Sequence, residues 1–253
     1  MSLDLKNAPI IEAVIEFHCE LPPGQDRSGW ETALNQRFVA EYPQCQAQHL
    51  QEVQFQVGIG GDVPAAKAVR QGVHGFRHLS ADGKQLVQCR IDGFFFNRLS
   101  PYTSFDNYLP EALRCWDLYR EVAEPVIVRQ VCLRYINRLL LPLTEGQLSL
   151  GKYLKNPPVM ATPADGEPFS FVEFVHQHQM AALESKTLIS VVLASQPLEN
   201  ATLPLIFEIA AMRSGDFNPA DHAAFKVALQ SLRNLKNNVF ENTITPECLK
   251  LFQ

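Results

Sequence analysis

The feature that most constrains the fold of this chain is a period of two in the hydrophobic pattern near its start. From Ile11 to Leu21 the odd positions are all apolar, and the even positions are polar apart from Val14. Successive side chains of a strand point to opposite faces of a sheet, so this pattern predicts a strand with one buried and one solvated face. Strands of this kind are typical of antiparallel sheets that are covered on one side.

Seven further segments have the composition of strands. Residues 75–81 and 85–96 flank Asp82-Gly83, a pair that favours the positive φ angles of a hairpin turn. The segment 126–141 is followed by Pro142, which cannot donate a hydrogen bond to a neighbouring strand. The other predicted strands cover 49–57, 169–183, 188–194 and 205–212.

Apolar residues at steps of three and four predict three amphipathic helices between these strands. Ser28 and Glu31 form a capping-box pattern before the first helix, which ends before Pro43. The second helix covers 104–122, and the third begins with Asn218 as its N-cap. The apolar stripe of this third helix consists of Phe225, Leu229, Leu232, Leu235 and Val239.

The order of the predicted elements places the chain in the α+β class, with antiparallel sheets and amphipathic helices on one face. Residues 1–124 follow the order β-α-β-β-β-α, and residues 125–253 repeat it with a short helix within 143–168. We therefore expect two α+β halves, related by a diverged duplication, within one compact unit.

Composition narrows the partners and the location. The formal net charge of -5 lacks the broad positive charge of most nonspecific nucleic-acid binders, so we do not expect nucleic acid as a partner. No segment is apolar enough for a signal peptide or a membrane span, which predicts a cytoplasmic protein without membrane association. Six cysteines without a C-x-x-C pair then predict reduced thiols. Phosphate-loop motifs are absent, and we expect no cofactor.

Two predicted strands end in the same sequence, Asn-Arg-Leu, at 97–99 and 137–139. Strand parity puts Arg134 and Arg138 on one face of the second of these strands, and Tyr135 and Asn137 on the other. Two guanidinium groups at this spacing can clamp a carboxylate or phosphate, which requires an unpaired arginine beside a pocket. The candidate binding residues are Arg98, Tyr102, Arg134, Asn137, Arg138 and Glu208.

The structural alternative is that these arginines pair with carboxylates and hold a helix on the sheet. Candidate partners are Asp92, Glu111 and Asp117. Glu208 is a lone carboxylate in an apolar strand, and we expect an arginine partner for it.

Other polar residues in strands have simpler interpretations. Glu16 and His18 fall on the predicted solvated face of the first strand, where a polar side chain needs no function. His176 and His178 have the spacing of a metal site on a sheet, but the sequence offers no third ligand, so we expect no metal.

Several separated segments together resemble one family. They are Ala8-Pro9-Ile10-Ile11-Glu12-Ala13-Val14, the segment from Phe96 to Tyr102, Leu133-Arg134-Tyr135-Ile136-Asn137, and Phe240-Glu241 with Ile244-Thr245. Their order and spacing are similar to those of a sporadically distributed family of bacterial proteins of about this length whose function is uncharacterised. The resemblance covers the whole chain and brings no substrate or catalytic residue. Its patchy distribution implies an accessory role, such as a mobile-element, toxin-antitoxin or phage-defence component.

Two functions follow from these observations. The leading hypothesis is a non-catalytic binding or regulatory protein, possible as a homodimer, that holds a protein or a small anionic ligand on a sheet face or between its halves. The alternative is an enzyme acting on an anionic or nucleic-acid substrate. In that case Arg98, Arg134 and Arg138 grip the substrate, and Glu208 or a histidine is the acid or base.

Overall fold

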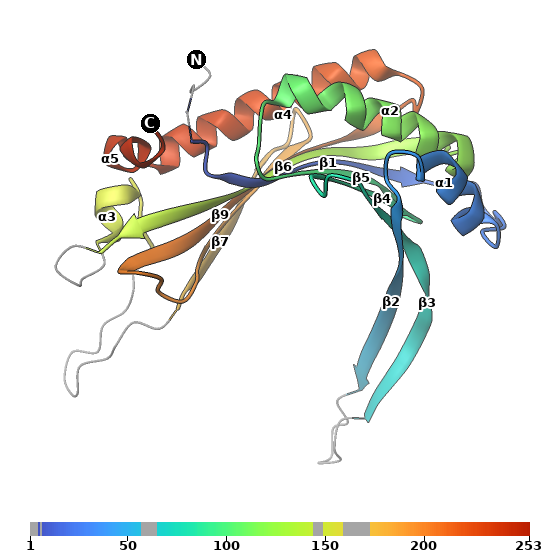
Figure 1. Cartoon of the computed structure of the whole chain (residues 1–253), viewed down its shortest axis with the longest axis horizontal. Coiled ribbons are helices and arrows are strands. Elements are labelled where there is room, and N and C mark those ends of the chain that lie inside the picture. The colour runs from blue at the N-terminus through green and yellow to red at the C-terminus, as the bar shows by residue number, and fades with distance from the viewer. Residues whose placement is uncertain (1–4, 6, 57–64, 144–148, 159–172) are drawn as a thin grey trace.

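The computed structural model describes residues 5, 7–56, 65–143, 149–158 and 173–253, with the side chains of 50–71 left aside. In this part of the chain, nine strands form one antiparallel sheet (Figure 1). The sheet and its helices confirm the predicted α+β class. The strands are β1 (Ile10–Glu20), β2 (Gln44–Gln56), β3 (Ala65–Leu79), β4 (Gln85–Arg90), β5 (Gly93–Leu99), β6 (Ile127–Pro142), β7 (Val175–Ala182), β8 (Thr187–Ser195) and β9 (Thr202–Phe217).

The strand order is β2-β3-β4-β5-β1-β6-β9-β8-β7, and β1 pairs with β6 at its centre. Outward from this pair, the sheet continues on one side with β5, β4, β3 and β2, and on the other side with β9, β8 and β7. Each predicted half therefore has its first strand at the centre of the sheet, next to its last strand. A duplication would produce this order, and the duplication itself stays a prediction. One sheet runs through both predicted halves, and the N-terminal half holds five strands rather than four.

The extra strand arises from a tight turn that the prediction missed, although Asp92-Gly93 is a second Asp-Gly pair. The predicted strand 85–96 is wrong as a single element, because Ile91 and Asp92 divide it into β4 and β5. Gly93 follows this turn with φ +155°, and a Cβ there would lie 2.4 Å from the carbonyl oxygen of Phe17. Only glycine fits both that backbone angle and that close approach of β1.

The helices cover one face of the sheet (Figure 1). The N-caps of α2 and α4 are Ser104 and Asp221, whose side chains accept hydrogen bonds from backbone N–H groups of the first turn. Two predicted caps are wrong: α1 begins after Gly29 without a side-chain cap, and α4 begins three residues after the predicted Asn218-Pro219 start. The helices are α1 (Trp30–Phe38), α2 (Phe105–Ala123), α3 (Leu150–Tyr153), α4 (His222–Thr243) and α5 (Pro246–Leu249), followed by a 3-10 turn (Lys250–Phe252).

The core lies between this helical layer and the sheet. Phe17 of β1 has its ring centroid 4.6 Å from that of Phe225 on α4 and 5.0 Å from that of Trp116 on α2. The Trp116 indole N–H donates to the Pro219 carbonyl at 2.9 Å, so the largest core side chain keeps its polar atom bonded. Aromatic contacts of this kind each stabilise a core by about 0.5–1.5 kcal/mol beyond their area. They fix both long helices on the centre of the sheet.

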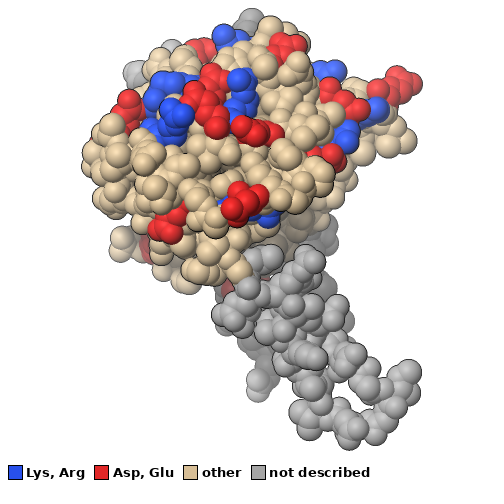
Figure 2. Space-filling view, turned by 90° about the vertical axis from the view of Figure 1, so that its right-hand side faces the viewer, with Lys and Arg blue, Asp and Glu red and all other residues tan. Residues whose placement is uncertain are grey.

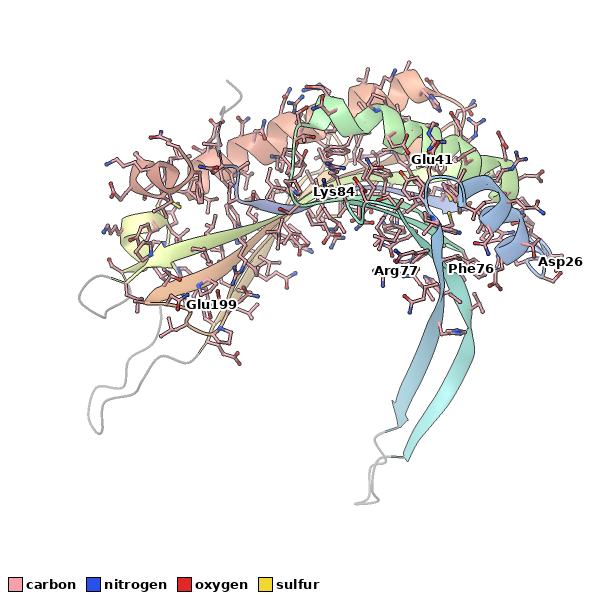
Figure 3. The ribbon with its side chains drawn as sticks, in the orientation of Figure 1. Asp26, Glu41, Phe76, Arg77, Lys84 and Glu199 are labelled. Atoms are coloured by element: carbon pink, nitrogen blue, oxygen red, sulfur yellow. The ribbon has the colours of Figure 1, made fainter. Side chains whose placement is uncertain are left out.

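The opposite face of the sheet is concave, and the β2–β3 hairpin and the β7–β9 strands descend on its two sides (Figure 1). Adjacent residues of β3 show the two faces: Phe76 packs in the core, and exposed Arg77 points to the inside of the arch (Figure 3). No helix among the described residues is long and apolar enough to cross a membrane.

Candidate functional site

Arg134, Arg138 and Glu208, which were predicted to bind a ligand, lie on the concave face of the sheet. Arg98 does not, because its pairing with the core residue Ala13 of β1 places it on the helical face. Arg134 of β6 donates from Nε to Glu16 Oε1 at 2.7 Å and from Nη1 to Glu208 Oε1 at 3.1 Å. Glu16 belongs to β1 and Glu208 to β9, the two strands that flank β6. The arginine therefore ties three adjacent strands together, and the expected arginine partner of Glu208 is confirmed.

Glu16 is buried, with a relative exposure of 3%. The prediction that it lies on a solvated face is wrong, because the side chains of two flanking strands cover this central strand. Burial raises the pKa of the Glu16 carboxyl, but the hydrogen bond with His18 and the charge of Arg134 outweigh it and leave the pKa below 4.5. The carboxylate is thus ionised, so the His18 Nε2 nitrogen, 3.0 Å from Glu16 Oε2, is the donor.

The other two predicted arginines also have partners. Arg138 donates from Nε to Gln196 and from Nη2 to the exposed carboxylate of Glu199, which lies toward the β7–β9 side of the arch (Figure 3). Arg98 donates weakly to the Pro101 carbonyl at 3.5 Å.

The expectation of an unpaired Arg134 or Arg138 beside a pocket is therefore wrong. The predicted partners are wrong as well, because each candidate carboxylate binds an arginine close to it in sequence. Asp92 pairs with Arg90, Glu111 with Arg114, and Asp117 with Arg120.

Tyr102 and Asn137 lie on the other side of the sheet, as the strand parity of Asn137 predicts. Both line a cavity of about 310 Å³ between the start of α2, the middle of α4, β6 and the segment before β1. Its lining comes from both predicted halves of the chain. The residues that matter for its chemistry are Tyr102, Tyr135, Asn137, Arg233, Lys236 and Glu241, and its apolar wall includes Leu5, Pro9, Ile10, Phe105 and Phe240.

Lys236 is the most unusual residue of this cavity. Its relative exposure is 9%, and its Nζ lies 3.9 Å from the centroid of the Tyr135 ring. Among the described residues, the ammonium has neither a hydrogen-bond nor an ion-pair partner. Burial and the nearby charge of Arg233 lower the Lys236 pKa from 10.5 to about 8, although Glu241 opposes this shift.

Three tyrosine hydroxyls form a chain beside Lys236. The Tyr135 oxygen lies 2.9 Å from that of Tyr108 and 3.1 Å from that of Tyr102. Burial raises the pKa of all three hydroxyls, so each keeps its proton. Buried Tyr108 does not line the cavity, so its O–H is satisfied by donating to Tyr135. Tyr135 and Tyr102 share the second hydrogen bond, which leaves one of their two hydrogens to point into the cavity.

Arg233 adds a second cation, one turn before Lys236 on α4. Its Nη1 binds the exposed carboxylate of Asp106 at 3.2 Å, and its guanidinium lies 5.0 Å from the Phe105 ring centroid. Asn137 donates from Nδ2 to the Phe207 carbonyl, which fixes its amide at the floor of the cavity. The polar wall therefore presents mainly donors and positive charge, a composition that suits an anion.

Lys236 was not among the predicted site residues, although the sequence holds a signal for it. The predicted stripe of α4 continued from Leu232 to Leu235 and Val239, but the buried positions are Lys236 and Phe240. Steps of four, three and four from Phe225 lead to Lys236, a lysine in line with core residues. That placement is rare unless the charge has a use.

Metal chemistry has no support in the described part of the chain. His176 and His178 are exposed on β7, with ring centroids 5.4 Å apart. No three His, Cys, Asp or Glu side chains among the described residues are placed to hold a metal ion.

Comparisons with known proteins indicate no function for this chain, so the cavity is the main evidence for its function. No family model, curated protein or solved structure matches this chain. On the face shown in Figure 2, Lys and Arg are interspersed with Asp and Glu, and this face lacks the broad basic field of nucleic-acid binders. What the fold and the site define is an α+β protein with a small, donor-rich cavity.

Proposed function

We propose that this protein binds a small anionic ligand in the cavity around Lys236. One observation carries the proposal: a buried ammonium without a carboxylate partner. An uncompensated buried charge destabilises a fold, and proteins retain such charges mainly where a ligand or a reaction uses them. A bound carboxylate or phosphate supplies the missing partner.

The cavity also defines the form of the ligand. Lys236 offers three N–H donors, the hydrogen-bonded pair of Tyr102 and Tyr135 offers one O–H, and Arg233 adds positive charge to the lining. Leu5, Ile10 and other apolar side chains also line the cavity. A volume of about 310 Å³ lies at the lower end of the range of roughly 300–1,000 Å³ that is typical of small-molecule pockets. The ligand is thus a short carbon skeleton with one acidic group.

Binding rather than turnover is the proposed activity, within an accessory or regulatory protein of the bacterial cytoplasm. The family resemblance supports the accessory role. All six cysteines lie in the described residues and are free thiols, which supports a reducing compartment. The network of Glu16, Arg134 and Glu208 has no part in this function, because each of its charged groups already has a partner within the network.

The test is calorimetric titration and thermal unfolding with inorganic phosphate and straight-chain carboxylates from acetate to hexanoate. We expect at least one acid to bind and to raise the melting temperature by mass action. Lys236→Met removes that shift, whereas Lys226→Met, at an exposed position of the same helix, keeps it. An equal shift in the wild-type protein and in Lys236→Met, or binding of no acid, overturns the proposal.

A further inference from the structure

Lys236 differs from an ordinary anion-binding lysine in its reactivity. A buried amine beside another cation loses its proton more easily than an exposed lysine, and the neutral amine is a nucleophile. Both conditions hold here, since Arg233 precedes Lys236 by one helical turn and the side chain is almost fully buried. With a pKa of about 8, roughly a tenth of the amines are neutral at pH 7.

Three features around the amine match what imine formation requires. No described carboxylate binds the ammonium, so no ion pair holds it in its charged form. The cavity gives a carbonyl compound access to Nζ, which lies against the Tyr135 ring. The hydroxyl chain ends at the cavity, where the Tyr102–Tyr135 pair has one free O–H as a proton donor.

We propose that Lys236 forms a reversible imine with a small oxo acid, whose carboxylate is held by Arg233. This inference rests on the proposed function and names its ligand class. Arg233 suits the carboxylate because Asp106 and the Phe105 ring hold its guanidinium in place while only Nη1 is engaged among the described contacts.

The chemistry balances without any other reagent. The Lys236 nitrogen attacks the carbonyl carbon, a C–N bond forms, and the carbonyl oxygen takes a proton from the free O–H of the Tyr102–Tyr135 pair. The nitrogen then loses its extra proton, which returns to the tyrosine. The hydroxyl leaves as water after a second protonation, while the nitrogen gives up its remaining proton and forms the C=N bond. The sum is amine plus carbonyl giving imine plus water.

The experiment is reductive trapping with glyoxylate as the probe. Wild-type protein is incubated with glyoxylate and cyanoborohydride, digested, and analysed by peptide mass mapping. We expect the Lys236 peptide to be modified at least ten times faster than the peptide with exposed Lys226. The rate should rise with pH and level off above about 8, the Lys236 pKa. Lys236→Arg keeps the positive charge and should lose the adduct, and acetaldehyde should react more slowly than glyoxylate because it lacks the carboxylate.

Modification of Lys236 no faster than that of Lys226 overturns the inference. Its failure can be told apart from failure of the proposed function. If glyoxylate still raises the melting temperature of both the wild-type protein and Lys236→Arg, the cavity binds anions and only the imine is wrong. If glyoxylate neither binds nor reacts, and no acid of the titration series binds, both proposals are wrong.

Discussion

The two faces of the sheet differ in the partners that they provide for a buried cation. On the concave face, Arg134 lies between two carboxylates, one of them almost fully buried. On the helical face, Lys236 is more deeply buried than Arg134 and has only an aromatic ring beside its ammonium. The two cations lie on opposite sides of β6. Arg134 projects from one face of this strand, and the ring of its neighbour Tyr135, which contacts Lys236, projects from the other.

The difference shows which of the two cations needs a ligand as its charge partner. A cation whose partners come from flanking strands is complete in the folded protein, and its loss is a loss of stability. A cation without a partner destabilises the folded protein until a ligand arrives. Opposite effects on stability should therefore separate the two sites.

The largest effect should come from Arg134→Met. This change leaves the buried Glu16 carboxylate with His18 alone and should lower the free energy of unfolding by about 3–4 kcal/mol. Urea denaturation measures it. Arg138→Met is the matched control on the same face, because its partner Glu199 is exposed and such pairs contribute about 0–1 kcal/mol. Equal losses in the two variants contradict a structural role specific to Arg134.

Lys236→Met should act in the other direction. The Lys236 pKa is about 8 in the folded protein and 10.5 ordinarily, so the unfolded chain holds the proton more tightly. Wild-type stability therefore rises as the pH rises from 8 to 10.5, and methionine should add up to about 3 kcal/mol below pH 8. Denaturation at pH 7 and at pH 11 tests this. The gain should vanish at pH 11, and a loss of stability at pH 7 contradicts an uncompensated charge.

The acid side of the stability curve should report on Glu16. Its pKa is below 4.5 in the folded protein, so the ionised carboxylate stabilises the fold above that pH, and this contribution is lost as the pH falls through the folded pKa. In Arg134→Met the main charge that lowers the pKa is gone, and burial should then raise it. The variant should therefore lose less stability between pH 6 and 4 than the wild type, as followed by urea midpoints.

Much of the fold could be predicted from local patterns. The strand that alternation predicts at 11–21 and the Asp82-Gly83 hairpin depend on neighbouring residues only, and both elements are present, although burial along β1 does not alternate. The Ile91-Asp92 turn was missed, although Asp92-Gly93 offered the same local signal as Asp82-Gly83. What could not be predicted is the close approach of Gly93 to Phe17, which is far away in sequence. The strand order likewise depends on pairing between distant segments.

The candidate site could likewise be predicted only where it depends on local patterns. Parity along β6 placed Arg134 and Asn137 correctly on opposite faces, because parity is a local property of a strand. It could not show that carboxylates from β1 and β9 would neutralise Arg134, since that depends on the register of three strands. Lys236 was missed for a local reason, a stripe on α4 that was followed to Leu235 instead.

The smallest predicted effect concerns Glu208, the outer partner of Arg134. Its side chain is 25% exposed, against 4% for Glu16, so solvent weakens its share of the pairing. We expect Glu208→Gln to lower the free energy of unfolding by about 1 kcal/mol or less, because the amide oxygen still accepts a hydrogen bond from Arg134. Glu16→Gln on the same arginine should lower it several times more. A double-mutant cycle between Arg134 and each carboxylate separates the two contributions. Equal coupling energies would mean that burial does not decide the strength of these pairs, and would remove the basis for contrasting Arg134 with Lys236.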